Sequence, residues 1–198
     1  MAMLLLPALD SLTISNRNAG SNRRGKRLTV GRERGYIYES YLFFDTSAVP
    51  RQISLLAAAL LLFKLNDFYD DSGAAFAVYP LAKSFSPLTT FANACPIVQD
   101  PELKAIFAPF RQDAVIEVDI TKIAAAWLEN RTINRGLAIS SDDTAAIFSC
   151  RTAFGSAYSK DRSLIPRLRL LYRAGPCINF LEPDAISCST VVLAPPRR

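Results

Sequence analysis

The side chains that most often perform catalysis are scarce in this sequence. It contains no histidine, which removes the commonest general base and metal ligand together with the Ser–His and Cys–His pairs that activate nucleophiles. The adjacent carboxylates Asp142 and Asp143 lie in a predicted turn, and nothing in the pattern pairs them with a group that would prepare one of them for acid–base work. We therefore expect a protein that is not an enzyme and that uses no cofactor.

Four cysteines are the other reactive side chains: Cys95, Cys150, Cys177 and Cys188. No two of them have the spacing of a zinc knuckle or a CxxC redox pair, and without histidine a metal site would need all four thiolates. We therefore predict no metal site. The cysteines are either small buried hydrophobic residues or partners in disulfides within or between subunits. Cys177 and Cys188 favour the second interpretation, because they follow the predicted domain.

Basic residues crowd the N-terminal fifth of a chain whose net charge is +5. One interpretation is a surface for nucleic acid, an anionic glycan or an acidic neighbour. The other is a solvated hairpin whose charges discourage incorrect strand pairing. No aromatic-rich RNA-binding motif or recognition helix accompanies the cluster, so we expect no nucleic-acid partner. The cluster comprises Arg17, Arg23, Arg24, Lys26, Arg27, Arg32 and Arg34, with one acid, Glu33, nearby.

The composition is apolar for a soluble monomer. Half of the residues are hydrophobic and the mean hydropathy is +0.15, which suggests surface that is buried against other subunits. The apolar run 55–63 is far shorter than the roughly 20 residues of a membrane-spanning helix, and it favours a buried strand. Residues 1–9 lack the basic start and cleavage site of a signal peptide. We expect no membrane span.

Residues 116–137 predict the central unit of the fold. Apolar and acidic residues alternate over 116–120, as in a strand with one buried face. Apolar residues then recur at helical spacing over 121–128, on a face that includes the single tryptophan, Trp127. Asp119 or the following threonine can cap this helix through a side-chain oxygen. A short amphipathic helix therefore interrupts an otherwise β-rich sequence.

Short strand candidates, separated by turn signals, cover most of the remaining chain. Their number and near-regular spacing predict an all-β fold, a jelly-roll-like β-sandwich with one short amphipathic helix and terminal extension arms. Residues 81–110, which are punctuated by prolines, are predicted as long loops with at most one short helical turn. The strand candidates are 12–14, 28–30, 37–44, 54–65, 75–80, 116–120, 136–140, 145–150 and 168–172.

A series of short motifs extends over most of the chain, from about residue 12 to residue 172. The motifs are Glu39 to Asp45 followed by Ala48-Val49-Pro50, the apolar strand 53–63, Val118 to Thr121 with Trp127, Asn134 to Leu137, Phe148-Ser149, and Pro166-Arg167-Leu168 with Tyr172. In this order they resemble the motifs of DNRLRE-type domains, a family of bacterial surface and extracellular modules.

The chain departs from that family's pattern at three places. Glu39 occupies a position where arginine is usual, and Ile165 replaces the arginine before Pro166. The segment near 85–91 lacks the family's tryptophans. A ligand site that uses those tryptophans is therefore not expected, whereas the implied fold does not depend on them.

The resemblance implies a non-catalytic jelly-roll-like module, with some relatives that are similar to carbohydrate-binding modules. It implies structural roles for the matched residues. Asp45 and Asp119 would accept backbone N–H bonds at strand ends, and Trp127 would fill the core between helix and sheet rather than serve as a sugar platform. The structural fingerprint comprises Asp45, Asp119, Trp127, Asn134, Gly136 and Pro166. Candidates for exposed rings that stack on sugars are Tyr36, Tyr38, Tyr69 and Tyr158.

Two largely apolar segments flank the predicted sandwich at 12–173. Residues 1–11 form an N-terminal arm, and residues 174–198 form a C-terminal arm with two strand-like segments, 177–181 and 185–193. Apolar arms of this kind favour strand addition to a neighbouring subunit, which gives rings or filaments according to symmetry. The alternative is that both arms fold back on their own sandwich.

Taken together, these patterns predict a non-catalytic structural subunit that assembles with itself into a filament, an appendage or a surface layer such as a spore coat. Disulfides through the four cysteines would cross-link it. The alternative function is a carbohydrate-binding or adhesion module for surface or acidic polysaccharides. We expect synthesis in the cytoplasm and a location at a cell or spore surface, reached without a classical signal peptide.

Overall fold

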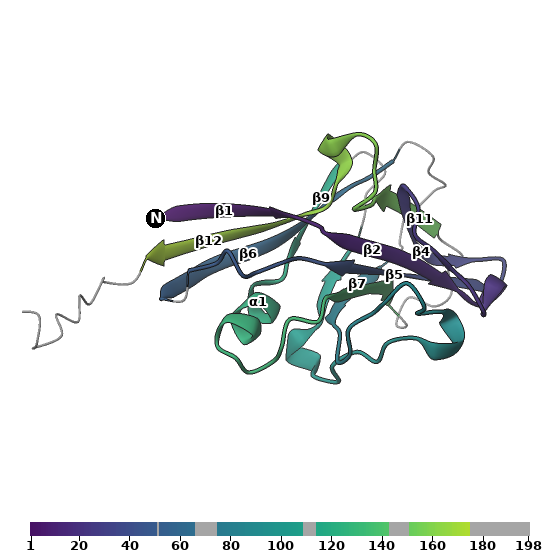
Figure 1. Ribbon diagram of the computed structural model, residues 1–198, viewed down its shortest axis with the longest axis horizontal. Helices are drawn as coiled ribbons and strands as arrows, with labels where there is room; N and C mark the ends of the chain where they lie inside the picture. The colour runs from purple at the N-terminus through teal and green to yellow at the C-terminus, as the bar shows by residue number, and fades with distance from the viewer. Residues whose placement is uncertain (51, 66–74, 109–113, 143–150, 175–198) are drawn as a thin grey trace, which may run out of the picture.

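The computed structural model describes residues 1–50, 52–65, 75–108, 114–142 and 151–174. Within these ranges, twelve strands form two antiparallel sheets that face each other, and one α-helix lies beside them (Figure 1). The prediction of an all-β sandwich with one short helix is therefore confirmed. The helical elements are η1 (Asn16–Asn18), η2 (Phe91–Asn93), η3 (Pro101–Leu103), α1 (Thr121–Leu128) and η5 (Arg162–Leu164).

The smaller sheet has four strands in the order β1-β12-β6-β9. Every pair in it is antiparallel, and β12 pairs with β1 on one side and with β6 on the other. Strands β1 and β9 are therefore its two edges. The bounds are Ala2–Pro7 for β1, Arg167–Ala174 for β12, Ile53–Phe63 for β6 and Val115–Asp119 for β9.

The larger sheet follows the order β11-β4-β5-β10-β7-β8, and β2 pairs with both β5 and β3. All of its pairings are antiparallel. The bounds are Asp10–Ser15 for β2, Asn22–Arg23 for β3, Arg27–Glu33 for β4, Tyr36–Phe43 for β5, Phe76–Pro80 for β7, Ala105–Phe107 for β8, Leu137–Ser141 for β10 and Arg151–Gly155 for β11.

The main core lies between the two sheets. Because successive side chains of a strand point to opposite faces, β6 and β12 place Leu60, Leu62, Leu168 and Leu170 inward, where at most 1% of each is exposed. The helix α1 extends this core through Trp127 and three other buried residues. The facing sheet contributes, among others, Leu28, Val30, Leu42, Phe76, Ile139 and Phe154.

A second, smaller core covers the opposite face of the larger sheet. Leu12 and Ile14 of β2 and Tyr41 of β5 are buried there beneath residues 81–98, which we call the 81–98 loop. The rings of Tyr41 and Phe85 lie with their centroids 5.7 Å apart. The proline-punctuated stretch that the sequence predicts as loop is therefore a cover for the sheet, and its short helical elements are η2 and η3.

The N-terminal segment differs from the predicted arm. Residues 2–7 form β1, which pairs with β12 of the same chain from Ala2↔Tyr172 to Pro7↔Arg167. Leu6 and Ala8 belong to the main core. The segment folds back in this way because its alternate leucines complete the apolar inner face of the sheet. A boundary at residue 11 therefore does not separate this segment from the sandwich.

Two short strands are not predicted, and two predicted segments lie outside the described residues. The sequence prediction misses β3 and β8, which have two and three residues respectively. The predicted strand 145–150 lies outside the described residues, and β11 begins immediately after it. The C-terminal arm also lies outside the described residues, apart from Ala174 at the end of β12.

Candidate functional site

The outer side of β1 is an open edge of the four-stranded sheet. The strand has the sequence AMLLLP and contains no charged residue. None of the described residues pairs with its outer side. Met3 and Leu5 are 64% and 39% exposed. An exposed edge strand with unpaired N–H and C=O groups and no charge is a template for pairing with another strand.

The other described sheet edges carry features that discourage such pairing. Strand β9, at the opposite edge of the same sheet, exposes Glu117 and Asp119. Strand β11 begins with Arg151. Strands β8 and β3 are only three and two residues long. Charge and short length both protect an edge, so β1 is the one described edge that combines length, exposure and a lack of charge.

The outer face of the sheet beside β1 is also largely apolar. Met3 of β1, Leu171 of β12 and the small residues Ala57 and Ala59 of β6 line a shallow hollow there. The ion pair between Arg169 and Glu117 borders it on the side of β9. The apolar surface therefore continues from the edge of β1 onto the adjacent face.

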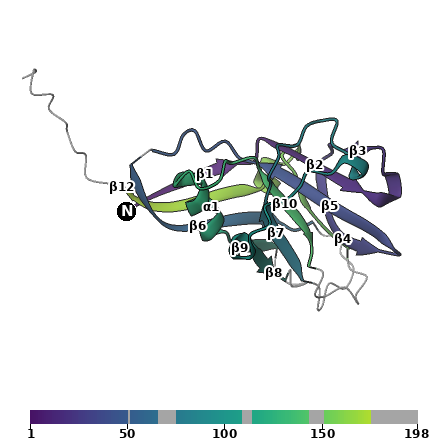
Figure 2. The same ribbon diagram turned by 90° about the horizontal axis from the view of Figure 1, so that it is seen from below.

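Residues 175–198 follow β12 at the same end of the molecule. Tyr172 pairs with Ala2, and β12 ends two residues later at Ala174. Figures 1 and 2 both show the N-terminus beside the end of β12, so this placement does not depend on the direction of view. The end of β12, from which the C-terminal segment continues, therefore lies next to β1.

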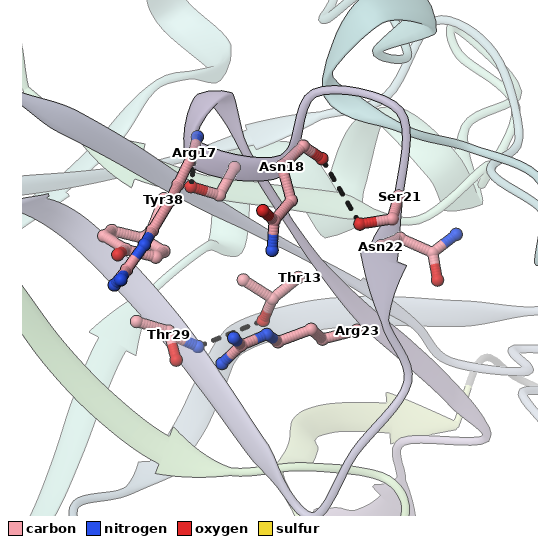
Figure 3. Close-up of a pocket in the computed structure, with 9 residues that line it drawn as sticks. Thr13, Arg17, Asn18, Ser21, Asn22, Arg23, Thr29 and Tyr38 are labelled. Atoms are coloured by element: carbon pink, nitrogen blue, oxygen red, sulfur yellow. Dashed lines mark hydrogen bonds between the residues drawn. The ribbon is translucent and has the colours of Figure 1, made fainter.

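A polar hollow lies at the other end of the molecule, between η1, β3 and β4. Its free volume is about 20 Å³, which is room for about one water molecule. Figure 3 shows Arg17 and Arg23 entering it from two sides, with the hydroxyl of Thr13 and Tyr38 also facing it. Hydroxyl and amide groups form the rest of the wall, from Ser15, Asn18, Ser21, Asn22 and Thr29.

A second, more open hollow adjoins the first and shares Arg23 and Thr29 with it. Its other basic residues are Lys26, Arg27 and Arg151. We call the two together the basic hollow. No acidic residue occurs among the residues that line it, although Arg151 reaches outside it to Glu33 at 2.8 Å. The two parts of the basic hollow are therefore lined by five cationic side chains in total.

Buried hydroxyl groups hold the strands behind the basic hollow. The Thr13 and Ser40 hydroxyls lie 2.8 Å apart, Thr13 Oγ1 accepts from the Thr29 N–H at 3.1 Å, and Ser40 donates to the Thr29 carbonyl at 2.8 Å. The side-chain amide of Asn22 donates to two carbonyls of the 81–98 loop, both at 2.6 Å. Hydrogen bonds of defined direction thus fix β4 and β3 relative to β2 and β5.

Three of the four tyrosines predicted as exposed rings lie within the described residues. Tyr38 is only 6% exposed, because alternation along β5 turns it to the inner face, so its prediction as an exposed ring is wrong. Tyr36 and Tyr158 are each 39% exposed, but arginine guanidinium groups lie over both rings, Arg17 at 5.3 Å and Arg24 at 5.2 Å from the centroids.

Tyr158 is also tied down at its hydroxyl group. The hydroxyl donates to Asp10 at 2.6 Å, and Arg24 binds the same carboxylate at 2.7 Å. Burial, followed by the hydrogen bond to Asp10, raises the pKa of Tyr158. The ring is therefore part of a fixed surface cluster. Tyr69, the fourth candidate, lies outside the described residues.

Only one of the four cysteines falls within the described residues. Cys95 is a free thiol that is 8% exposed in the second core, with its sulfur 3.6 Å from the Ser84 carbonyl. For Cys95 the structure therefore favours the buried-hydrophobe interpretation over a disulfide, because this residue of the 81–98 loop packs into the second core. Cys150, Cys177 and Cys188 lie outside the described residues.

The two fingerprint aspartates cap local turns. Asp45 accepts from the Ser47 N–H at 2.8 Å, and Asp119 accepts from the N–H and the hydroxyl of Thr121 at 2.9 and 2.6 Å. These hydrogen bonds lower the pKa of Asp45 and of Asp119. Thr121 also accepts from the Ala58 N–H at 2.9 Å, so the cap joins α1 to β6.

The remaining fingerprint residues also stabilise the sandwich. Trp127 is 7% exposed in the main core, and its ring N–H has no hydrogen-bond partner among the described residues. Asn134 donates to the Phe44 carbonyl at 2.8 Å and accepts from the Gly136 N–H at 3.2 Å. Gly136 has φ +102°, and a Cβ there would lie 2.6 Å from the Leu42 carbonyl oxygen. Pro166 accepts from the Ala8 N–H.

The described part of the chain offers little for other kinds of site. No group of three or more His, Cys, Asp or Glu residues in it could hold a metal ion. It also contains no helix that is long and apolar enough to cross a membrane.

Comparisons with known proteins give no assignment. No family model matches the chain, and no curated protein matches it. The resemblance to DNRLRE-type domains, which rests on the order of short motifs, therefore stays a prediction.

Proposed function

We propose that this chain is a non-catalytic structural subunit that assembles with copies of itself by adding a strand from one copy to the β1 edge of another. The exposed, uncharged and unpaired edge of β1 carries this proposal. An added strand satisfies the free N–H and C=O groups of β1, which gives affinity without any requirement for a particular side-chain pattern.

The apolar surface beside β1 adds a second source of binding energy. An added strand would cover the exposed side chains of Met3 and Leu5, and full burial of one such side chain contributes about 1.5–3 kcal/mol. The outer hollow floored by Ala57 and Ala59 leaves space for larger side chains of the incoming strand. The β1 edge and the outer hollow adjoin each other, so a single incoming strand can contact both.

The proposed donor is the C-terminal segment of a second copy. Its strand-like parts, 177–181 and 185–193, carry little charge, and it follows β12, which ends beside β1. Head-to-tail donation of this kind gives a ring or an open filament, depending on whether the rotation closes. Cys177 and Cys188 would then cross-link neighbours where the surroundings are oxidising. The proposal places these assemblies at a cell or spore surface.

Sedimentation velocity of the purified chain over a range of concentrations tests the proposal. The parent is expected to form concentration-dependent oligomers, and Leu5→Lys is expected to remain monomeric because a lysine on an edge strand opposes pairing. Val115→Lys is the matched control. Val115 is 50% exposed on the opposite edge of the same sheet, so this variant should assemble as the parent does.

Three outcomes would contradict the account. A parent that stays monomeric at every concentration would reject self-assembly, and a Leu5→Lys variant that assembles normally would reject the β1 edge. A chain that lacks 175–198 is expected to be monomeric. If that truncated chain still assembled, two β1 strands would be pairing directly, and the C-terminal segment would not be the donor.

A further inference from the structure

We propose that the basic hollow is a binding site for the carboxylate or sulfate groups of an acidic polysaccharide. Nothing in the self-assembly proposal uses this site, and the two surfaces lie at opposite ends of the long axis (Figure 1). A subunit that is engaged through β1 would therefore keep the hollow open to a ligand.

The charge distribution supports an anionic ligand. Arg17 and Arg23 enter the inner part of the hollow, and Lys26, Arg27 and Arg151 line its outer part. Within the described residues, neither Arg23 nor Lys26 forms an ion pair with a carboxylate. Like charges in a concave surface repel one another and raise the local concentration of anions. A bound anion relieves this repulsion.

The polar wall supports a sugar as the carrier of the anionic group. The hydroxyls of Ser15 and Ser21 and the side-chain amide of Asn18 line the inner hollow, whereas the Thr13 hydroxyl and the Asn22 side-chain N–H groups are already bonded to other protein groups. Hydroxyl and amide groups both donate and accept hydrogen bonds, as sugar hydroxyls require. Arginine forks meanwhile suit carboxylate and sulfate geometry, because they can donate two parallel hydrogen bonds.

Hydrogen bonds within the protein hold the strands behind the basic hollow in place without a ligand. The hydroxyls of Thr13 and Ser40 are buried, and they bond to each other and to the backbone of Thr29. Asn22 anchors the hairpin that carries Arg23 to the 81–98 loop. A preorganised site loses less conformational entropy when it binds.

The surroundings disfavour a nucleic acid as the anionic partner. Proteins that bind single strands combine a basic groove with aromatic rings on which bases stack. Here Tyr38 is buried, and the ring of Tyr36 lies under the Arg17 guanidinium. Neither of these two rings therefore offers the hollow an exposed face on which a base could stack.

Affinity electrophoresis of the full-length chain tests this proposal with four polymers in the gel. The probes are dextran sulfate, polygalacturonate, neutral dextran and single-stranded DNA. We expect retardation by the sulfated polymer, the carboxylated polymer or both, and the two arms distinguish these sources. Neutral dextran should not retard the chain, and added salt should weaken the retardation by screening the charges.

Substitution of the two inner arginines locates the site. The double variant Arg17→Gln with Arg23→Gln is expected to weaken binding about tenfold or more, because it removes two charged hydrogen-bond donors. Arg131→Gln combined with Arg162→Gln is the control with the same change in net charge, since both arginines are exposed and neither lines the hollow. It should bind as the parent does. A circular dichroism spectrum equal to that of the parent shows that the double variant is folded.

Each remaining outcome overturns the proposal. Absence of retardation by either acidic polysaccharide would reject the site, and equal loss in the control would reduce the effect to net charge. Binding that survives in the double variant would place the ligand elsewhere. Tighter binding of DNA than of both acidic polysaccharides at the same salt concentration would reject the polysaccharide. The Leu5→Lys variant separates the two proposals, because it should lose assembly and keep polysaccharide binding.

Discussion

The two ends of the sandwich are held together by different chemistry. At the end that carries β1, aliphatic side chains form the inner face of the four-stranded sheet, among them the register partners Leu6, Leu168 and Leu60. At the other end, strands β2, β4 and β5 meet through the buried hydroxyls of Thr13 and Ser40. Apolar packing has little directional preference, whereas hydrogen bonds fix angle and distance.

This difference matches the two surfaces. The aliphatic end leaves an uncharged edge that can accept any strand of suitable apolar character. The hydroxyl-bonded end holds guanidinium groups around a hollow of defined shape. Self-assembly needs an open edge, whereas recognition of a ligand needs a fixed frame, so each end suits the role proposed for it.

The largest expected effect is a loss of stability at the aliphatic end. Leu168 is fully buried between Leu6 and Leu60, so Leu168→Ala should reduce the free energy of unfolding by about 2–5 kcal/mol. Urea denaturation measures this change. Leu171→Ala, on the outer face of the same strand, should cost much less. Equal costs for the two variants would show that the sheets do not depend on this aliphatic contact.

An intermediate effect is expected from the hydroxyl network. Ser40→Ala removes the donor to the Thr29 carbonyl and the partner of the Thr13 hydroxyl, and it should reduce the free energy of unfolding by about 1–3 kcal/mol. Ser54→Ala on β6, where the side chain is exposed, is the control. If Ser40→Ala were as stable as the control, the basic end would not rely on buried hydroxyls.

The smallest effect tests whether a polar contact matters within the aliphatic sheet. Asp119→Ala removes the acceptor for Thr121 at the start of α1 and should cost about 1 kcal/mol at neutral pH. The hydrogen bonds from Thr121 lower the pKa of Asp119 below its ordinary value of 3.8. The stabilisation is therefore complete above that value and is lost as the pH falls through the lower pKa of the folded state.

The measurement for Asp119 is urea denaturation of parent and variant at several pH values. The difference in unfolding free energy should shrink below about pH 4. Glu102→Ala, at an exposed carboxylate of η3, is the control for a general loss of negative charge. A difference that grows in acid would contradict the proposed cap.

The sequence predicts those elements whose pattern is local. Alternation in residues 116–120, helical spacing in 121–128 and the apolar run of β6 each identify an element that the structure contains. The strand β1 escapes prediction, because its leucines are consecutive and only pairing with β12, more than 160 residues away, makes them a strand. Short β8 depends in the same way on β7.

The candidate sites also combine features that are local in the sequence with features that depend on long-range pairing. The cluster of basic residues is visible in the sequence, but Arg151 joins it only through the pairing of β11 with β4. Tyr38 is the opposite case, a residue predicted to be exposed that is buried. Alternation along β5 separates its two faces, but it does not reveal which face is covered. Residue types could be predicted, whereas their convergence and burial depend on long-range pairing.

Hydrogen exchange of the β1 backbone amides, measured at low and high protein concentration, tests the central claim most directly. The N–H groups of Met3 and Leu5 point away from β12, because those of the alternate residues pair with it. Strand addition predicts that these two amides exchange quickly at low concentration and become protected as oligomers form, while those of the β9 edge change little. Oligomers that form while the β1 amides stay equally unprotected at every concentration would contradict the account.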